Sequence, residues 1–328
     1  MIAPWRSTKK YWLKNKAVMP DTPSRILVIK LGALGDIVLA LGPFAAIRRD
    51  HPDAHVTLLT TRPYVEFLKP SEYFDDIWVD DRPVLCQPHR WWALRKRLRG
   101  ARFDKVYDLQ TSDRSGWYFR LMGPGARPQW SGIAAGCSHP HANPERDIMH
   151  SIERQNEQMA MAGIIDVPAT DLSWVKARID RFDLAGRFCL LVPGGALHRP
   201  AKRWPAAHYG ALAAKLAADG IQPVILGMAD ESPLAAVIRG LCARAIDLTG
   251  QTSLVEIAAL ARAASGSVGN DTGPMHMIAA AGCPSIVLFS AVSDPSLAAP
   301  RGPETKILQC GSLVEMPLDE VAAALSLR

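Results

Sequence analysis

Short apolar segments alternate with helical segments along most of this chain, and the series occurs twice. In the first half, strands are expected at 25–30, 55–60, 76–79 and 105–109, with helices at 37–49 and 150–163. In the second half they are expected at 188–192, 222–226, 245–248, 266–268 and 285–289, with helices at 206–218, 233–244, 254–264 and 274–281. This alternation is typical of parallel sheets covered by helices. We therefore predict an α/β fold with two doubly wound, Rossmann-like domains.

The 328 residues suffice for two domains of ordinary size. We expect a basic and aromatic extension at 1–24, a first domain at 25–170, and a second at 171–328 that ends in a helix. The segment 122–147 is rich in Gly, Pro, Ser and His, which predicts loops that reach over a site. Doubly wound domains bind ligands at the carboxyl ends of their strands, so the site is expected in the central cleft between the domains.

Basic residues gather in two runs within a chain of net charge +6. Residues 1–16 and 82–103 contain no acid and interleave Arg and Lys with Trp or Tyr. This pattern suits an anionic membrane surface or a polyanionic acceptor, and the alternative is a solvated basic face. No segment is apolar enough to span a membrane. The six cysteines are scattered without metal-ligand spacing, so we expect reduced cytosolic thiols and no metal site. We also expect no nucleic-acid partner.

The segment Ser267–His276 predicts an anion site. It is a strand that ends in Asn270 and Asp271 and turns directly into a helix, with Pro274 in the first helical turn. The free N–H groups of a helix start and its positive dipole favour a bound phosphate, and Thr272 and His276 add side-chain donors.

A second phosphate-type turn follows the first strand of the second half. Gly194 and Gly195 allow close backbone approach, and Lys202 and Arg203 bring positive charge to the start of the next helix. Alone, either turn could be structural. Two such turns at equivalent strand ends favour a diphosphate.

Acidic and polar side chains at other strand ends have two interpretations each. Asp36, in the turn Gly32–Asp36, is either a helix cap or a general base that faces the anion sites. Asp108, Gln110 and Arg114 either line the same cleft or form an ordinary polar loop. Glu231 either binds ribose hydroxyls or is an acid favoured at a helix start.

These motifs together resemble glycosyltransferase family 9, the heptosyltransferases that build the lipopolysaccharide inner core. The similarity covers about 25–310. It is carried by 29–36, by 193–194 with 202–205, by 248–250 with 253–254, and by 270–276. The resemblance implies a GT-B fold, an ADP-sugar donor in the second domain, an acceptor in the first, and inverting transfer without a metal or other cofactor.

The resemblance also implies residue roles. Asp36 would be the general base, with Gly35 beside it at the acceptor, and Lys202 would neutralise the leaving diphosphate. Thr249, Asp271, Thr272, Gly273 and His276 would line the donor, together with the glycine turn, Arg203 and Glu231.

The sequence predicts a cytoplasmic enzyme, peripheral on the inner face of the inner membrane, that transfers a heptose or related sugar to a lipopolysaccharide core acceptor. One alternative is a family member with another nucleotide sugar or another cell-surface glycan acceptor. A distant alternative is a nucleotide-binding oxidoreductase, although the dinucleotide glycine fingerprint is missing from the chain.

Overall fold

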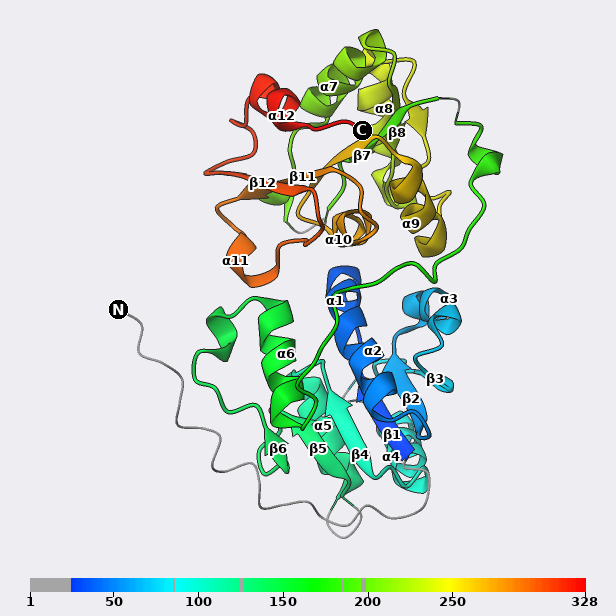
Figure 1. The fold of residues 1–328 in the computed structure, drawn as a ribbon, viewed down its shortest axis with the longest axis vertical. Helices are drawn as coiled ribbons and strands as arrows, with labels where there is room; N and C mark the ends of the chain where they lie inside the picture. The colour runs from blue at the N-terminus through cyan, green and yellow to red at the C-terminus, as the bar shows by residue number, and fades with distance from the viewer. Residues whose placement is uncertain (1–24, 85, 124–126, 185, 196–198) are drawn as a thin grey trace.

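The structure is a computed structural model that describes residues 25–84, 86–123, 127–184, 186–195 and 199–328. The expected extension at 1–24 lies outside the described residues. Two parallel sheets of six strands each lie one above the other along the long axis of the molecule (Figure 1). Helices cover both sheets, so the predicted α/β, doubly wound fold is confirmed.

The first sheet has the order β3-β2-β1-β4-β5-β6. Its strands are β1 (Arg25–Ile29), β2 (His55–Thr60), β3 (Asp76–Val79), β4 (Lys105–Asp108), β5 (Gln129–Gly132) and β6 (His139–Pro140). The side chains of β1 alternate between two layers, as strand geometry requires. Ile26 and Val28 pack against α1 (Leu34–Leu39), α2 (Leu41–Asp50) and α6 (Ser151–Met161), whereas Leu27 and Ile29 pack against α4 (Pro88–Gly100) and α5 (Asp113–Met122). A short helix, α3 (Val65–Leu68), follows β2.

The second sheet has the order β12-β11-β10-β7-β8-β9. Its strands are β7 (Phe188–Val192), β8 (Gln222–Ile225), β9 (Ile246–Asp247), β10 (Gly266–Asn270), β11 (Ser285–Ser290) and β12 (Thr305–Cys310). Its helices are α7 (Ala206–Ala218), α8 (Ser232–Leu241), α9 (Leu254–Ala263), α10 (Gly273–Ala280), α11 (Pro295–Ala298) and α12 (Leu318–Ala324). The strands β7, β10 and β11 are almost wholly buried, as expected for central strands of a parallel sheet.

Two sequence expectations need correction. The helix expected at 37–49 is two helices that meet at Ala40, because Pro43 has no N–H with which to continue the hydrogen-bond series of α1. The segment 122–147 is not loop alone, since it contributes β5 and the edge strand β6. The domain boundary predicted near residue 170 stays a prediction, and it falls in the segment between α6 and β7.

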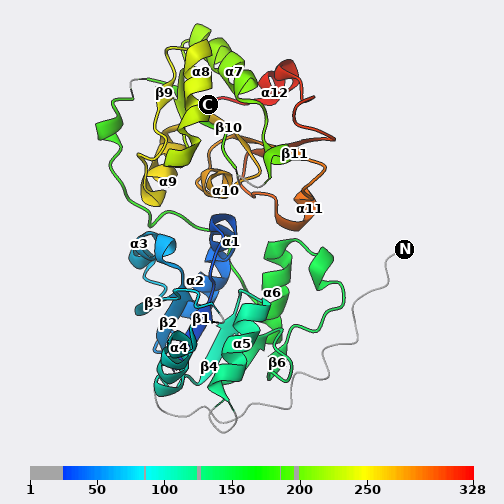
Figure 2. The ribbon, with the colours of Figure 1, turned by 180° about the vertical axis from the view of Figure 1, so that it is seen from behind.

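The two halves meet where α1 faces α10, as both ribbon views show (Figures 1 and 2). A second contact joins the start of α6 to the α11 region, where His150 Nε2 lies 3.1 Å from the carbonyl oxygen of Ala299 and Glu153 pairs with Arg301. One buried cluster contains side chains of both sheets, among them Val28 and Val192. The halves are therefore packed together rather than only tethered.

No helix among the described residues is long and apolar enough to cross a membrane. All six cysteines lie in the described part of the chain and are unpaired.

Candidate functional site

Sheet topology brings the two predicted phosphate turns together. Strands β10 and β7 are neighbours at the centre of the second sheet, with β8 and β9 beyond β7. Because parallel strands end at the same edge, the loops at 271–273, 193–195, 227–231 and 248–250 lie side by side at the face toward the first domain. Residues 196–198 of the second turn lie outside the described residues.

Lys202 and Asp271 form an ion pair at the centre of this face. Their Nζ and Oδ2 atoms are 2.6 Å apart, and the side chains are 15% and 16% exposed. The residues come from the two separate turns, so this pair joins them. Lys202 is held where an anion at the start of α10 would meet it.

Glu231 occupies the predicted glycine turn. Its Oε1 accepts a 2.8 Å hydrogen bond from the N–H of Gly195, and its Oε2 accepts one of 2.8 Å from the N–H of Met228. A Cβ atom at Gly194 would lie 2.0 Å from Oε1, so only glycine fits there. The carboxylate therefore closes a helix start and fills the glycine turn, and its binding to ribose hydroxyls stays a prediction.

Unpaired polar atoms point to a ligand at the same place. The Thr272 hydroxyl, His276 Nδ1 and Arg203 Nε are buried without a hydrogen-bond partner among the described residues. Arg203 also donates through Nη2 to the carbonyl oxygen of Gly195. Burial of unpaired polar groups costs free energy, so a ligand that pairs with them would be stabilised.

Thr249 supports this loop cluster with its methyl group. Its hydroxyl donates to Asp247 at 2.7 Å, while its Cγ2 would lie 3.2 Å from a Cβ at Gly227. The hydroxyl is thus already paired, and Thr249 packs beside the backbone that carries Glu231.

Asn270 is a site residue that the sequence analysis noted only as a strand end. It is fully buried, and its Nδ2 donates to the carbonyl oxygens of Pro193 and Gly194 at 2.8 and 3.0 Å. Its Oδ1 accepts from Trp204 N at 3.0 Å and from the Tyr209 hydroxyl at 3.1 Å. One side chain therefore fixes the second turn, on both sides of Lys202, against the start of α10. A polar residue at the end of a buried strand was the available signal.

Two glycines let α1 and α10 cross closely. A Cβ at Gly35 would lie 2.7 Å from His276 Cδ2, and a Cβ at Gly273 would lie 2.7 Å from Leu34 Cβ. Burial lowers the pKa of His276 to about 4, and the carboxylates of Asp271 and Asp36 only partly offset this effect. The imidazole is therefore neutral at pH 7 between the two domains.

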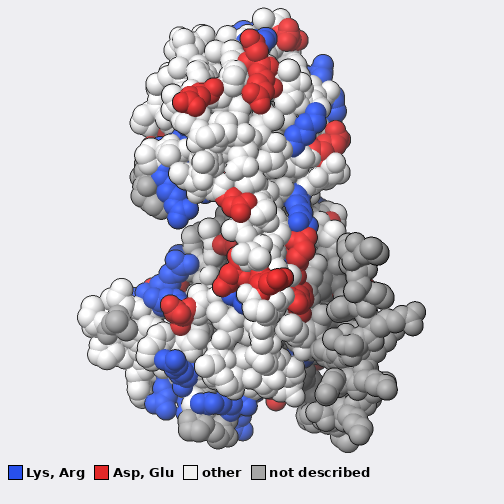
Figure 3. All heavy atoms as spheres, turned by 90° about the vertical axis from the view of Figure 1, so that its left-hand side faces the viewer, with Lys and Arg blue, Asp and Glu red and all other residues white. Residues whose placement is uncertain are grey.

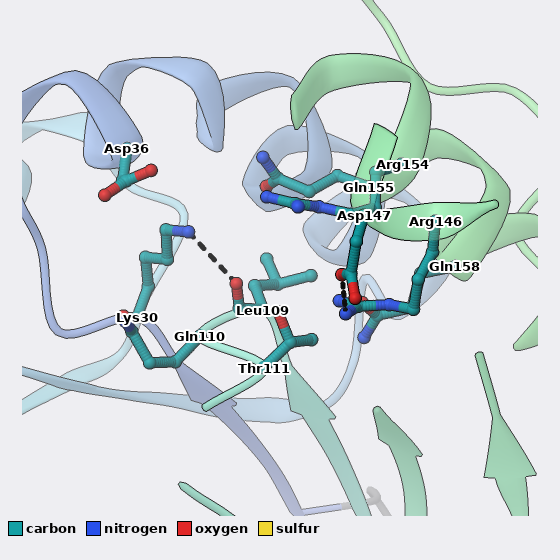
Figure 4. Close-up of a pocket in the computed structure, with 10 residues that line it drawn as sticks. All are labelled: Lys30, Asp36, Leu109, Gln110, Thr111, Arg146, Asp147, Arg154, Gln155 and Gln158. Carbon is teal, nitrogen blue, oxygen red and sulfur yellow. Dashed lines mark hydrogen bonds and ion pairs between the residues drawn. The ribbon is translucent and has the colours of Figure 1, made fainter. Parts of the chain in front are cut away.

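Asp36 caps the start of α1, and its role as a general base stays a prediction. Its Oδ2 accepts a 2.9 Å hydrogen bond from the N–H of Ala33, and the side chain also lines a partly open polar cavity of about 210 Å³. Figure 4 shows the cavity, which Lys30, Arg146 and Arg154 line together with neutral and acidic groups. The remaining lining residues are Leu109, Gln110, Thr111, Asp147, Gln155 and Gln158.

The cations of this cavity were not predicted. Lys30 is 5% exposed, donates from Nζ to the carbonyl oxygen of Leu109 at 3.0 Å, and has its pKa lowered by burial. Arg146 Nε and Gln155 Oε1 are buried without partners among the described residues. Lys30 directly follows β1 and Arg154 lies on α6, so only the folded chain brings them together.

The three predicted acceptor residues of the 108–114 segment separate in the structure. Gln110 lines the cavity, and its Oε1 accepts from Leu31 N at 2.8 Å. Asp108 is fully buried and caps the turn through the N–H groups of Gln110 and Thr111, and burial raises its pKa to about 6. Arg114 lies in a different groove, with its guanidinium 5.6 Å from the Trp91 ring centroid. Only Gln110 is therefore on the wall of the cavity beside Asp36.

Comparisons with known proteins agree with this architecture. The sequence pattern of glycosyltransferase family 9 (heptosyltransferase) matches residues 91–319. Lipopolysaccharide heptosyltransferase 2 of Escherichia coli K12 is 34% identical over 313 residues, which cover 87% of this chain and 88% of that protein.

Two solved E. coli structures have the same fold. The ADP-heptose LPS heptosyltransferase II superposes with a TM-score of 0.74 at 22% identity, over 92% of this chain and 98% of the other. The heptosyltransferase WaaC with ADP superposes with a TM-score of 0.73 at 20% identity, over 91% of this chain and 98% of the other.

Two facing Rossmann-like domains, with paired anion turns on one and a carboxylate-lined cavity on the other, define a glycosyltransferase of the GT-B fold. The chain belongs to glycosyltransferase family 9, the heptosyltransferases. Nothing in the comparisons favours the oxidoreductase alternative.

Proposed function

We propose that this enzyme transfers a heptose from an ADP-sugar to an acceptor of the lipopolysaccharide inner core, with inversion and without a metal. The observation that carries the proposal is the Lys202–Asp271 pair at the start of α10, across the domain contact from Asp36. The similarity to E. coli lipopolysaccharide heptosyltransferase 2 and to the ADP-heptose LPS heptosyltransferase II supports the donor and the acceptor class.

The donor diphosphate is proposed to lie against the start of α10. There it would receive hydrogen bonds from Thr272 and the helix N–H groups, and positive charge from Lys202 and Arg203. Glu231 now accepts from the Gly195 N–H, so a phosphate oxygen that takes this N–H would free the carboxylate for the ribose hydroxyls. Asp271 holds Lys202 in place until the donor arrives.

The acceptor is proposed to enter the cavity beside Asp36. Lys30, Arg146 and Arg154 place three cations in its wall, against the two carboxylates of Asp36 and Asp147. A sugar that carries an acidic group suits this lining, because its carboxylate or phosphate would pair with the excess cation while its hydroxyls meet Gln110 and Gln158.

The proposed chemistry is a single displacement. Asp36 takes the proton of the acceptor hydroxyl as its oxygen forms a bond to the anomeric carbon, and the bond from that carbon to the diphosphate breaks on the opposite face. Lys202 and the helix dipole stabilise the charge that grows on the leaving ADP. Attack and departure on opposite faces produce inversion.

We propose that no metal ion or other cofactor takes part, because the donor site supplies its own positive charge through Lys202, Arg203 and α10. Among the described residues, no group of three or more His, Cys, Asp or Glu side chains is arranged to hold a metal. Transfer that persists undiminished in the presence of a strong chelator is the expected result, and loss of transfer restored by a divalent cation would contradict it.

The location is also a proposal. We infer that the enzyme works in the cytoplasm as a peripheral protein of the inner membrane, where a lipid-linked acceptor is exposed to it. The basic runs at 1–16 and 90–99 support this, although the first lies outside the described residues.

The decisive experiment incubates the protein with a panel of nucleotide sugars and core-truncated lipopolysaccharide, followed by mass analysis of the products. We expect addition of one heptose mass from ADP-heptose and no addition from UDP- or GDP-sugars. Addition of another sugar, or to another glycan only, would favour the alternative family member.

Asp36→Asn should lower the turnover by roughly 10²–10⁴-fold while ADP still binds, because the amide cannot take the proton. Asp113→Asn is the matched control, since Asp113 is also a helix-start acid of the first domain but is exposed and lies outside the cavity. Turnover close to that of the unchanged enzyme in Asp36→Asn would show that Asp36 is only a cap.

A further inference from the structure

The geometry points to a membrane-docking face formed by α4, α5 and the groove that Pro83, Val84 and Cys86 line beside α5. The occupant that we assign to it is the surface of an anionic lipid bilayer. The inference deepens the proposed function and rests on it, because a lipid-linked acceptor must be met at a bilayer. We call this surface the α4–α5 face.

Exposed apolar side chains gather on the α4–α5 face. Trp92 is 63% exposed, Trp117 is 50% exposed and Val84 is 52% exposed. Val84 and Trp117 also line a groove of about 610 Å³, together with Pro83, Cys86, Trp91 and Arg114, and Trp92 lies on α4 next to the groove residue Trp91. Figure 2 shows α4 and α5 together on the outer side of the first sheet. Contiguous exposed apolar surface of this kind marks an interaction site rather than scattered surface residues.

Basic side chains surround these aromatic rings. Residues 82–103 contain seven Arg or Lys and no acid, and α5 adds Arg114 and Arg120. Figure 3 shows Lys and Arg side chains gathered at the lower left of that view. The Lys96 ammonium lies 5.5 Å from the centroid of the Trp92 ring, and the Arg120 guanidinium 4.8 Å from that of Trp117. Each exposed indole is thus paired with a cation.

This pairing favours a bilayer over a nucleic acid. Lys96 and Arg120 each lie over one face of the rings of Trp92 and Trp117. The groove is lined mainly by apolar side chains, with the Arg114 guanidinium as its cation. Indoles beside Arg and Lys are the side chains that lie at the headgroup level of anionic membranes, where the ring meets acyl chains and the cation meets phosphate.

The α4–α5 face continues to the proposed acceptor site. Arg82 and Asp81, which precede the groove residues Pro83 and Val84, line a second hollow of about 500 Å³ together with Ala33. The N–H of Ala33 is bonded to Asp36. An acceptor whose lipid stays in the bilayer under α4 and α5 can therefore present its sugars along residues 80–84 to the base.

The test measures flotation of the full chain with vesicles of phosphatidylethanolamine containing phosphatidylglycerol, and with phosphatidylcholine vesicles. A basic residue near an anionic surface contributes roughly fivefold to partitioning, so the triple variant Arg90→Gln/Lys96→Gln/Arg120→Gln should bind about 100-fold more weakly. The charge-matched control, Lys176→Gln/Arg178→Gln/Arg239→Gln, removes three exposed cations elsewhere and should bind like the unchanged protein. The double variant Trp92→Ala/Trp117→Ala should also bind the vesicles more weakly, and it should do so even at low salt, because the indole rings contribute apolar contact rather than charge.

Transfer to a water-soluble, lipid-free core oligosaccharide separates docking from chemistry. The docking variants should keep this activity and lose it only with acceptor embedded in vesicles. Equal binding by the docking triple variant and the control triple variant, or equal binding to both vesicle types, would overturn the α4–α5 face. If the unchanged enzyme does not transfer sugar to the soluble acceptor at all, that result would instead count against the proposed function.

Discussion

At the scale of single residues, Asn270 is the group on which the donor site depends most. Its amide bonds to Pro193, Gly194, Trp204 and Tyr209, so it sets the distance between the turn that carries Lys202 and the helix that carries Thr272. A side chain that positions two binding loops acts on affinity and turnover without itself contacting the substrate.

Asn270→Asp tests this positioning role. The variant keeps the acceptor oxygen for Trp204 but directs a second oxygen at the carbonyls of Pro193 and Gly194, which have no hydrogen to offer it. We expect ADP affinity, measured by calorimetry, to fall by at least about tenfold, the effect of losing one or two hydrogen bonds. Tyr209→Phe removes only one partner and should retain most of the affinity. If Asn270→Asp binds ADP as tightly as the unchanged protein, Asn270 does not position the donor site and is only a residue of the core.

His276 predicts a pH dependence of stability. Its pKa is about 4 in the folded protein against 6.5 for an ordinary histidine, so between these values the unfolded chain binds more protons. The free energy of unfolding should therefore fall as the pH drops from 6.5 to 4, by at most about 3 kcal/mol from this residue. Above pH 6.5 the contribution is fully present and constant.

The measurement is the difference in unfolding free energy between the unchanged protein and His276→Gln, by urea titration at several pH values. Asp108, whose pKa is raised to about 6 by burial, changes stability in the opposite direction, but it is present in both proteins and cancels. A difference that stays flat from pH 6.5 to 4 would contradict the burial of a neutral imidazole.

At the scale of elements, the crossing of α1 and α10 carries the site. Gly273→Ala would place a methyl group 2.7 Å from Leu34 Cβ, so the helices must separate. We expect a lower turnover with little change in helix content, because the base and the phosphate site move apart. Gly240→Ala is the control, since nothing lies within 4 Å of its new methyl group, and it should be neutral or slightly stabilising. Equal kinetics in both variants would mean that the crossing is not needed for transfer.

Elements with a clear periodicity could be predicted, and those defined by packing could not. The strands β1, β2, β7 and β11 are apolar runs bounded by polar turns, and the sequence places them within a residue of their observed limits. Strands β5 and β6 are short and contain polar and aromatic residues, and β6 lies at the sheet edge, so their composition resembles that of loops.

The site divides in the same way. Turns such as 193–195 and 270–273 are local in sequence and are visible as glycine and polar residues at strand ends. The cavity beside Asp36 joins residues from positions 30 to 158, and their meeting depends on how α6 packs against the sheet. Arg114 shows that closeness in sequence does not predict a shared cavity, because it lies only four residues after Gln110 but lines a different groove.

At the scale of the whole molecule, the two halves share one buried cluster that includes Val28, Ile37, Val192 and Met275. Such packing couples them, so a ligand of the second domain should also stabilise the first. Binding at 100 times the dissociation constant stabilises the folded state by about 2.7 kcal/mol.

Hydrogen exchange measures this coupling. We expect ADP to slow amide exchange in peptides from α1 and α6 as well as in α10, because α1 packs on α10 and α6 contacts the α11 region. An unrelated nucleotide at the same concentration is the control. Protection restricted to the second domain would show that the halves open independently.

The paired glycines also bear on how enzymes of this kind can be recombined. Gly35 accommodates His276, and Gly273 accommodates Leu34, so each domain supplies one glycine and one side chain that fills the space opposite. A hybrid that joins the donor half of this protein to the acceptor half of a relative needs all four positions to match. New sugar and acceptor combinations made by domain exchange would therefore have to transfer this interlocking set as a unit.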